Sequence, residues 1–177
     1  MTDADAIHRS LRDPASFERL FERHFAVIYR YLRRRVGAQT AEDLVAETFV
    51  RAFAARSTYD RSWPDARPWL FGIATNVLRG RLQQDHRQPI ALAEPEADEI
   101  AASEGRLDAT TAMAERADAL LALPAEQREV LLLVAVGELT YEETARALGI
   151  AVGTVRSRLS RARAQLLAAV PVEEPTA

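Results

Sequence analysis

Apolar side chains recur every three or four positions near the start of the chain, a spacing that predicts an amphipathic helix. Asp13 and Pro14 suit its beginning, because an aspartate can cap free amides and a proline fits the first helical position. The helix is expected to end near Gly37, after three consecutive arginines whose charge suits the last turn. Its predicted buried stripe consists of Phe17, Leu20, Phe21, Phe25, Ile28 and Leu32.

A second amphipathic helix is expected to follow. Thr40 with Asp43 three residues later resembles a capping box, which marks the start of a helix. The polar, turn-forming residues 57–65 end it. Its predicted apolar side carries Leu44, Thr48, Phe49, Ala52 and Phe53.

A third helix is predicted from about Pro68. Gly72 and Gly80 lower its intrinsic helicity, so packing against other elements must hold it. The side chains expected to be buried on one side of it are Trp69, Leu70, Ile73 and Val77.

The middle of the chain has no helical or strand periodicity. From Asp85 to about Leu107 the pattern is interrupted by Pro89 and Pro95. Six acidic residues stand against one arginine in the segment Glu94 to Asp108. Such a composition cannot bury a core and predicts a flexible linker.

The last third of the chain predicts helices again. One is expected through Leu120 to Leu123, ending at Pro124, and another over 125–136, ending at Gly137. No segment alternates with the period of a strand over a useful length. The sequence therefore predicts an all-α fold: two small helical domains, residues 13–84 and 110–170, joined by a flexible acidic linker at 85–109.

A helix-turn-helix is predicted within the second domain. Thr140 and Glu143 form a capping box for a short helix that ends at Gly149, and a longer helix runs on to about Leu167. The long helix has one apolar side and, between Thr154 and Gln165, no acidic residue. Arginine can bond bidentately to a guanine edge or a phosphate, so this polar side suits DNA. The alternative is an ordinary solvated helix face. The candidate DNA contacts are Thr154, Arg156, Ser157, Arg158, Ser160, Arg161 and Arg163.

Composition excludes several classes of protein. The chain has 177 residues, 48% of them hydrophobic, and its longest aliphatic run, residues 130–136, is far too short to span a bilayer. The charged N-terminus lacks the apolar stretch of a secretory signal, which predicts a cytoplasmic protein without membrane insertion. The chain has no cysteine, and its three histidines are scattered, so no metal, cofactor or catalytic residue is expected. The net charge of −3 argues against a protein that coats nucleic acid indiscriminately.

Three stretches resemble motifs of the extracytoplasmic-function (ECF) sigma factors, the small group of the sigma-70 family. Ala41–Phe53 resembles region 2.2, which binds the clamp helices of the RNA polymerase β′ subunit. Arg67–Leu82 resembles regions 2.3 and 2.4, which melt and read the −10 promoter element. Leu123–Leu166 resembles region 4, which reads the −35 element. The resemblance extends over about residues 17–168, and the order and spacing of its parts are highly specific.

The resemblance implies a subunit without catalytic activity that binds core RNA polymerase, at the β′ clamp and other core surfaces, and directs it to promoter DNA. It also implies an anti-sigma factor as a partner. No cofactor is implied.

The polymerase-binding residues implied by the resemblance are Asp43, Glu47 and Arg51, which share the polar face of the second helix. Their spacing suits an ionic docking strip. The alternative is a simple intrahelical pair between Glu47 and Arg51, which the residues alone would favour.

The −10 contacts are expected in residues 59–63 and in the third helix, because single-strand binding requires aromatic platforms beside cations. Asn76 matches the family's asparagine and is the expected base reader. The alternative makes Trp69 part of the core, which we favour, and Trp63 a loop anchor. The predicted −10 contacts are Tyr59, Asp60, Arg61, Trp63, Asn76 and Arg79.

The chain departs from the family pattern at three places. Ala46 stands where the family often has glutamine, and residues 79–81 stand where an aspartate is common. Ala151 replaces a serine that often caps the recognition helix, which predicts a less firmly held first turn.

Two other function classes fit less well. A helix-turn-helix regulator with a sensory domain would usually carry an α/β receiver, and the N-terminal half has no strand pattern. A helical enzyme would need chemistry that the sequence lacks, such as a phosphate-binding glycine loop, an H-E-x-x-H metal pair or a serine elbow. Association with core RNA polymerase distinguishes the regulator from the sigma factor.

Overall fold

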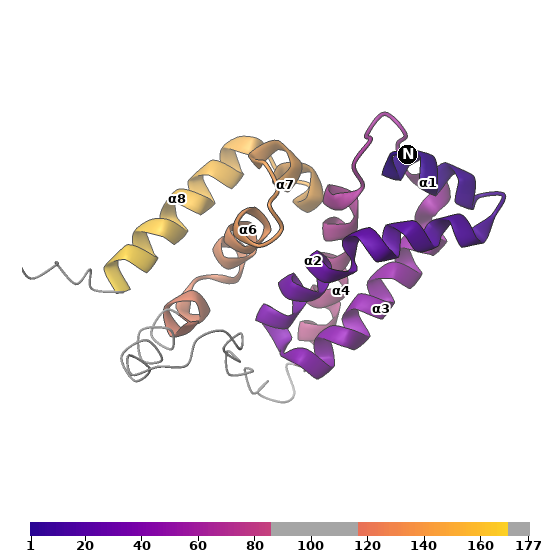
Figure 1. Ribbon diagram of the computed structural model, residues 1–177. Helices are drawn as coiled ribbons and strands as arrows, with labels where there is room; N and C mark the ends of the chain where they lie inside the picture. The colour runs from indigo at the N-terminus through magenta and orange to yellow at the C-terminus, as the bar shows by residue number, and fades with distance from the viewer. Residues whose placement is uncertain (86–116, 170–177) are drawn as a thin grey trace, which may run out of the picture.

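The computed structural model describes residues 1–85 and 117–169, and within these ranges the chain is helical and contains no strand (Figure 1). The predicted all-α fold is confirmed. Of the linker predicted at 85–109, only Asp85 lies among the described residues, as the last residue of a helix. None of the helices in the described ranges has the length and apolar character to cross a lipid bilayer.

The first group of helices forms the N-terminal half of the molecule. Within it α2 and α3 pack side by side, and α4 packs against both. Its elements are α1 (Asp3–Ser10), the 3-10 turn η1 (Pro14–Phe17), α2 (Glu18–Val36), α3 (Ala38–Ala55), the 3-10 turn η2 (Arg56–Thr58) and α4 (Arg67–Asp85).

The start of α3 differs from the sequence prediction. The helix begins at Ala38, so Thr40 lies inside it and does not act as its cap. The reason is Gly37, whose φ of 81° lets one residue both end α2 and precede α3. The predicted capping box of Thr40 and Asp43 is therefore wrong.

Helix α1 is an element that the sequence patterns did not predict. It is only eight residues long, too short for a clear apolar period. Its first turn is closed by a capping box, in which the Asp5 N–H donates to the Thr2 hydroxyl at 3.2 Å and the Thr2 N–H donates to the Asp5 carboxylate at 2.9 Å. Ile7 is fully buried and fixes the helix to the first group.

The second group contains the predicted helix-turn-helix. Its elements are a helical stretch at 117–122, then α6 (Ala125–Ala135), α7 (Tyr141–Leu148) and α8 (Val152–Ala169). The predicted capping box of Thr140 and Glu143 is present at the start of α7. Gly149, with φ of 65°, ends α7 in the left-handed conformation that glycine adopts without strain.

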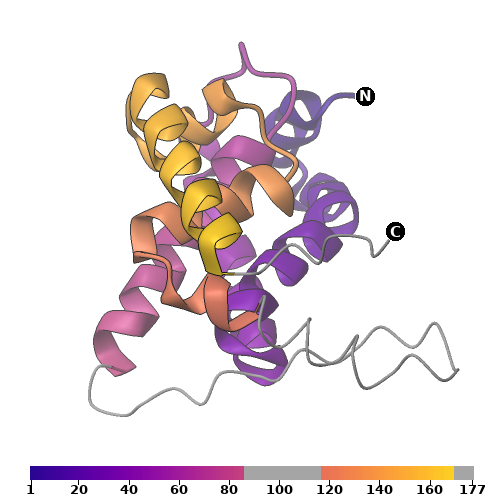
Figure 2. The ribbon, with the colours of Figure 1, turned by 90° about the vertical axis from the view of Figure 1, so that its left-hand side faces the viewer.

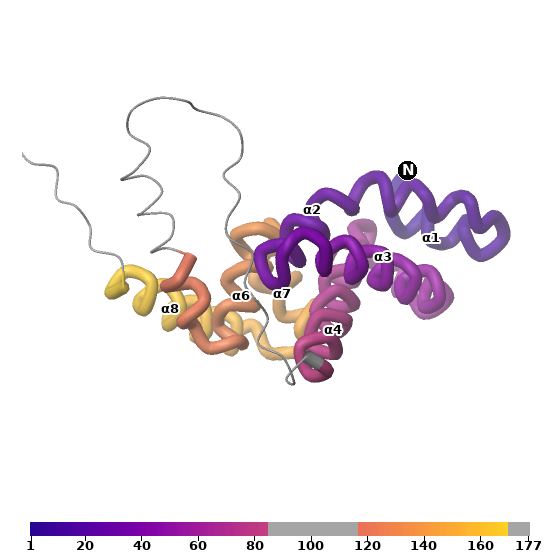
Figure 3. The backbone as a smooth tube through the Cα atoms, turned by 90° about the horizontal axis from the view of Figure 1, so that it is seen from below, coloured from indigo at the N-terminus to yellow at the C-terminus, as the bar shows by residue number. Residues whose placement is uncertain are grey.

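The two groups share one hydrophobic core, which the sequence did not predict. Helix α4 contacts α3 and α2 on one side and α7 on the other, and its Phe71 and Leu78 are fully buried. Leu132, Leu133 and Leu139 of the second group belong to the same cluster as the core of the first. In Figures 1 and 3, α8 lies at one end of the molecule and α1 at the other, and the remaining labelled helices lie between them.

This close packing explains a glycine inside α4. A Cβ atom at Gly72 would lie 2.9 Å from the backbone oxygen of Ala147 in α7, which is closer than carbon and oxygen can approach. Gly72 weakens the helix by itself, but it allows α4 and α7 to touch.

Candidate functional site

Helix α8 is the most exposed cationic element of the second group. Its inner side is held by Val155 and Leu159, which form a small core with Val130 and Ala145. The turn before it is fixed because the Ile150 N–H donates to the Ala145 carbonyl at 3.0 Å. In Figure 2 the helix faces the viewer, in front of the other helices.

The seven predicted DNA-contacting residues of α8 fall into two sets. The exposed set is Arg156, Ser160, Arg161 and Arg163. The half-buried set is Thr154, Ser157 and Arg158. Within it, the Ser157 hydroxyl donates to the Thr154 carbonyl at 3.1 Å, and Arg158 forms an ion pair with Glu126 of α6.

Three members of the exposed set share one shallow groove of about 340 Å³. Arg156, Ser160 and Arg163 line it together with Tyr141, the first residue of α7. Tyr141 was missed by sequence reasoning, although its place directly after the Thr140 cap fixes it beside the long helix. The groove offers two cations, a hydroxyl and a phenol to an incoming polyanion.

The loop before α4 carries four of the predicted −10 residues. Asp60, Arg61 and Trp63 are exposed, whereas Tyr59 is buried. The Tyr59 hydroxyl donates to two carbonyl oxygens, that of Trp63 at 2.7 Å and that of Asp65 at 3.2 Å. Burial raises the pKa of Tyr59 to about 12, and the Asp3 carboxylate acts in the same direction. Tyr59 therefore shapes the loop, and Asp60 tightens it by accepting the Ser62 N–H at 2.9 Å.

Helix α4 carries the two other predicted −10 residues. Asn76 is exposed on it. Arg79 makes two hydrogen bonds to Glu129 of α6, from Nε to Oε1 at 3.2 Å and from Nη2 to Oε2 at 2.6 Å. Trp69 is half-buried and packs edge-to-face on Tyr59 with 5.0 Å between ring centroids, in line with the core role favoured for it.

The predicted polymerase-binding strip lies on the surface of α3. Asp43, Glu47 and Arg51 are all exposed, and Glu47 and Arg51 form the intrahelical ion pair that was the alternative interpretation. The pair does not remove either group from the surface. Surface pairs of this kind contribute little to stability.

An apolar groove of about 390 Å³ adjoins this strip. It lies between α2 and α3, and Val50, with 68% of its surface exposed, is its most accessible member. Phe21 and Phe25 were predicted to be buried, and this prediction is wrong, because they lie at the edge of the α2 stripe and remain exposed. Phe21 packs instead on Phe49, with 4.9 Å between ring centroids. The residues that line the groove are Phe17, Phe21, Ala46, Phe49, Val50 and Phe53.

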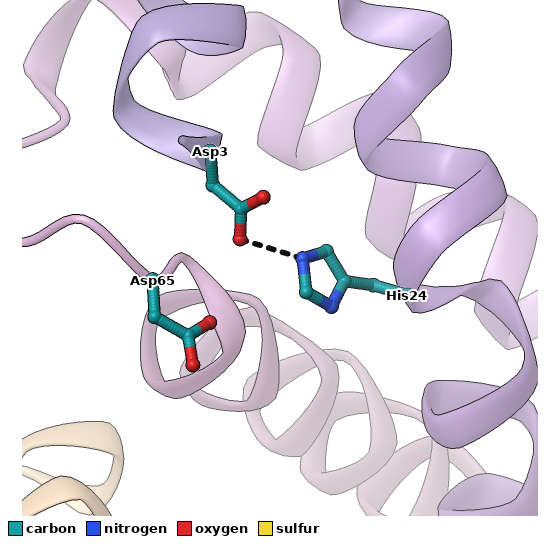
Figure 4. A group of neighbouring side chains, drawn as sticks. All are labelled: Asp3, His24 and Asp65. Atoms are coloured by element: carbon teal, nitrogen blue, oxygen red, sulfur yellow. Dashed lines mark hydrogen bonds and ion pairs between the residues drawn. The ribbon is translucent and has the colours of Figure 1, made fainter. Parts of the chain in front are cut away.

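A buried ionic cluster fixes the N-terminus (Figure 4). The Asp3 carboxylate accepts hydrogen bonds from His24 at 2.7 Å and from the Ala66 N–H at 3.0 Å, and it also pairs with Arg23. Burial raises the pKa of Asp3, but the His24 and Ala66 hydrogen bonds outweigh it and bring the value to about 2.

Asp3, His24 and Asp65 bring potential metal ligands within 4.8 Å of one another. However, the neighbouring Asp65 carboxylate accepts from the N–H and Nε of Arg67, at 2.9 and 3.0 Å. Protein donors therefore already occupy both carboxylates, so the cluster fits a structural clamp better than a metal site.

Comparisons with known proteins agree with this geometry. The sequence model described as Sigma-70 region 2 matches residues 20–88, and the one described as Sigma-70, region 4 matches residues 117–166. The ECF RNA polymerase sigma factor EcfG of Rhodopseudomonas palustris is 35% identical over 137 residues, which cover 77% of this chain and 75% of that protein. The ECF sigma factor SigM of Mycobacterium tuberculosis is 34% identical over 160 residues, covering 87% and 76%.

Two solved structures are similar to both helical groups together. One is CnrH in complex with the cytosolic domain of CnrY, with a TM-score of 0.71 and 28% identity, covering 94% of this chain and 95% of that chain. The other is the sigma factor RpoE in complex with the anti-sigma factor NepR from Bartonella quintana, with a TM-score of 0.69 and 27% identity, covering 89% and 98%. From the helix-turn-helix, the shared order of regions and these relatives, we conclude that the chain belongs to the ECF family of RNA polymerase sigma factors.

Proposed function

We propose that this sigma factor reads the −35 element with the exposed side of α8 while its first helical group opens the −10 element. The observation that carries the proposal is the grouping of Arg156, Ser160 and Arg163 in one groove at the surface of α8. An α-helix fits the major groove of DNA, and these side chains can reach base edges or phosphates from it. The comparisons favour this function over a helix-turn-helix regulator that acts without polymerase.

The −10 element is assigned to the loop before α4 and to α4 itself. Trp63 offers an exposed aromatic surface, Arg61 a neighbouring cation, and Asn76 a side chain that can donate to and accept from a base edge. The buried Tyr59 supports this arrangement, because its hydroxyl donates a hydrogen bond to the Trp63 carbonyl.

Core polymerase is assigned to α3. Asp43 and Glu47 supply the ionic strip. The apolar groove beside them, around Val50, adds apolar surface that a partner can bury on binding. An apolar patch rimmed by charges is typical of a protein interface, in which burial supplies affinity and the charges fix the register. The sequence had predicted the charges alone.

We also propose that the chain catalyses no reaction of its own, that it acts in the cytoplasm, and that an anti-sigma factor holds it inactive. The last rests on the two similar structures, whose sigma factors were solved with CnrY and NepR bound.

Reconstitution with core RNA polymerase tests the proposed function. The holoenzyme should initiate at promoters that core enzyme alone does not use, mapped by start-site sequencing. Arg156→Ala should lower initiation, whereas Arg12→Ala, an exposed arginine before η1, should not. Binding of the free chain to those promoters at full strength without polymerase would favour the regulator instead.

A further inference from the structure

The exposed Trp63 is carried by a loop that has no helical structure of its own. The loop covers residues 59–66, between η2 and α4, so no ladder of helical hydrogen bonds fixes its backbone. Part of the fixation comes from within the loop, where the buried Tyr59 hydroxyl donates to the carbonyl oxygens of Trp63 at 2.7 Å and Asp65 at 3.2 Å. Trp63 itself stays at the surface, with 43% of the residue exposed.

The rest of the fixation comes from Asp3, the first residue of α1. Its backbone N–H donates to the Pro64 carbonyl oxygen at 3.1 Å, and its carboxylate accepts from the Ala66 N–H at 3.0 Å. Together with the two bonds from Tyr59, these contacts bind a backbone atom of every residue from 63 to 66. The chain is therefore held at each residue between Trp63 and the start of α4.

Asp3 is in turn held by α2. Its side chain is 3% exposed, pairs with Arg23 and lies 2.7 Å from Nε2 of the buried His24 (Figure 4). A buried carboxylate whose bonds are all made is rigid, so it fixes the loop relative to α2. Because Asp3 is buried, it does not reach DNA itself, and any effect that it has on DNA passes through the loop.

We propose that Asp3 is a positioning residue for −10 recognition, which holds the backbone of residues 63–66 so that Trp63 is presented to the unpaired strand. A loop that is ordered before binding does not have to be ordered by the DNA, and affinity rises accordingly. Helix α1 thereby serves promoter opening without touching the promoter. The contact of Trp63 with DNA rests on the proposed function, whereas the hold on the loop rests on the four backbone bonds.

Two variants release the loop from opposite sides. Asp3→Ala removes the acceptor of the Ala66 N–H and leaves the capping box of Thr2 and Asp5 in place. Tyr59→Phe removes only the hydroxyl that binds the Trp63 and Asp65 carbonyls. The control is Ile28→Ala, which shortens a fully buried side chain of α2 and lowers stability without removing a bond to the loop. All variants are compared at a temperature at which denaturation curves show each of them folded.

Amide hydrogen exchange of the free protein measures the hold on the loop without any DNA. In Asp3→Ala and in Tyr59→Phe, exchange in residues 59–66 should be about tenfold faster than in the parent, because local opening becomes easier. Ile28→Ala should leave exchange in the loop unchanged. Parent-like exchange in both loop variants, or the same acceleration in Ile28→Ala, would overturn the hold.

The consequence for DNA is measured with holoenzyme and a fluorescein-labelled single strand that carries the −10 element of a promoter mapped by its start site. Asp3→Ala and Tyr59→Phe should bind this strand about fivefold more weakly than the parent. Binding to core polymerase and to duplex DNA with the −35 element should not change, and Ile28→Ala should match the parent in all three assays.

Two results would overturn the positioning role. One is faster exchange in the loop with unchanged affinity for the −10 strand. The other is an equal loss of all three binding activities, which a general loss of structure would cause. Failure of the proposed function is distinguishable from both, because the parent holoenzyme itself would then neither initiate nor prefer the −10 strand over a strand of random sequence.

Discussion

The Asp3 carboxylate and the His24 imidazole lie 2.7 Å apart in the interior of the first helical group and join α1 to α2. Asp3 also accepts the N–H of Ala66, just before α4, so one carboxylate connects three segments. Neutralising it should loosen all three segments at once.

We therefore expect Asp3→Asn to lower the free energy of unfolding at neutral pH. A carboxyl group whose pKa falls from 3.8 to about 2 on folding contributes about 2 kcal/mol. Urea denaturation measures the loss, with the exposed Asp118→Asn as the control. An unchanged midpoint for Asp3→Asn would show that the clamp does not stabilise the fold.

The same pair predicts a pH dependence. Because folding lowers the pKa of Asp3, its contribution is complete above the unfolded value of 3.8 and is lost as pH falls through the folded value of about 2. The difference in stability between the parent and Asp3→Asn should therefore shrink from about pH 4 to about pH 2. A difference in stability that stays constant between pH 4 and pH 2 would show that folding does not lower the pKa of Asp3.

Polymerase binding should depend on α3. Reversing Asp43 and Glu47 to arginine should weaken association with core polymerase at least tenfold, or about 1.4 kcal/mol, because the docking strip changes sign. Val50→Asn should weaken it independently by making the apolar groove polar. All three residues are exposed, so circular dichroism melting should be unchanged. Asp118→Arg is the control, and equal affinity of all variants would remove α3 from the interface.

The helix boundaries that the sequence predicted correctly are those set by local chemistry. Thr140, Glu143 and Gly149 delimit α7 through bonds within a few residues, so their pattern was sufficient. Thr40 matched the same capping pattern and failed, because the backbone of Gly37 had already started the helix.

Tertiary packing decided the rest. Phe21 and Phe25 repeat with the helical period, yet the core accepts only the centre of a stripe and leaves its edge exposed. Gly72 looked like a weakness in α4, and only the position of Ala147 in space explains it. The contacts of Asp3 with His24 and of Arg79 with Glu129 join residues far apart in the chain, which no local period encodes.

Asn76 should act on DNA without acting on the fold. It is exposed on α4, so Asn76→Ala should leave the melting temperature unchanged while slowing open-complex formation and relaxing preference at one −10 position. Gln83→Ala, also exposed on α4, is the matched control. A lower melting temperature with the −10 preference intact would instead assign Asn76 a structural role.

Selection of active promoters from a library with a randomised −35 element, using holoenzyme reconstituted with each variant, shows whether α8 reads that element. If Arg156 or Arg161 bonds bidentately to a base, its change to alanine should cost about 1 to 3 kcal/mol and alter the preference at one defined position. Arg163→Ala, removing a phosphate contact, should weaken all sequences alike and reduce the salt slope by about one unit. We expect these two distinct outcomes; unaltered −35 selectivity in both Arg156→Ala and Arg161→Ala would show that this face of α8 does not read the −35 element.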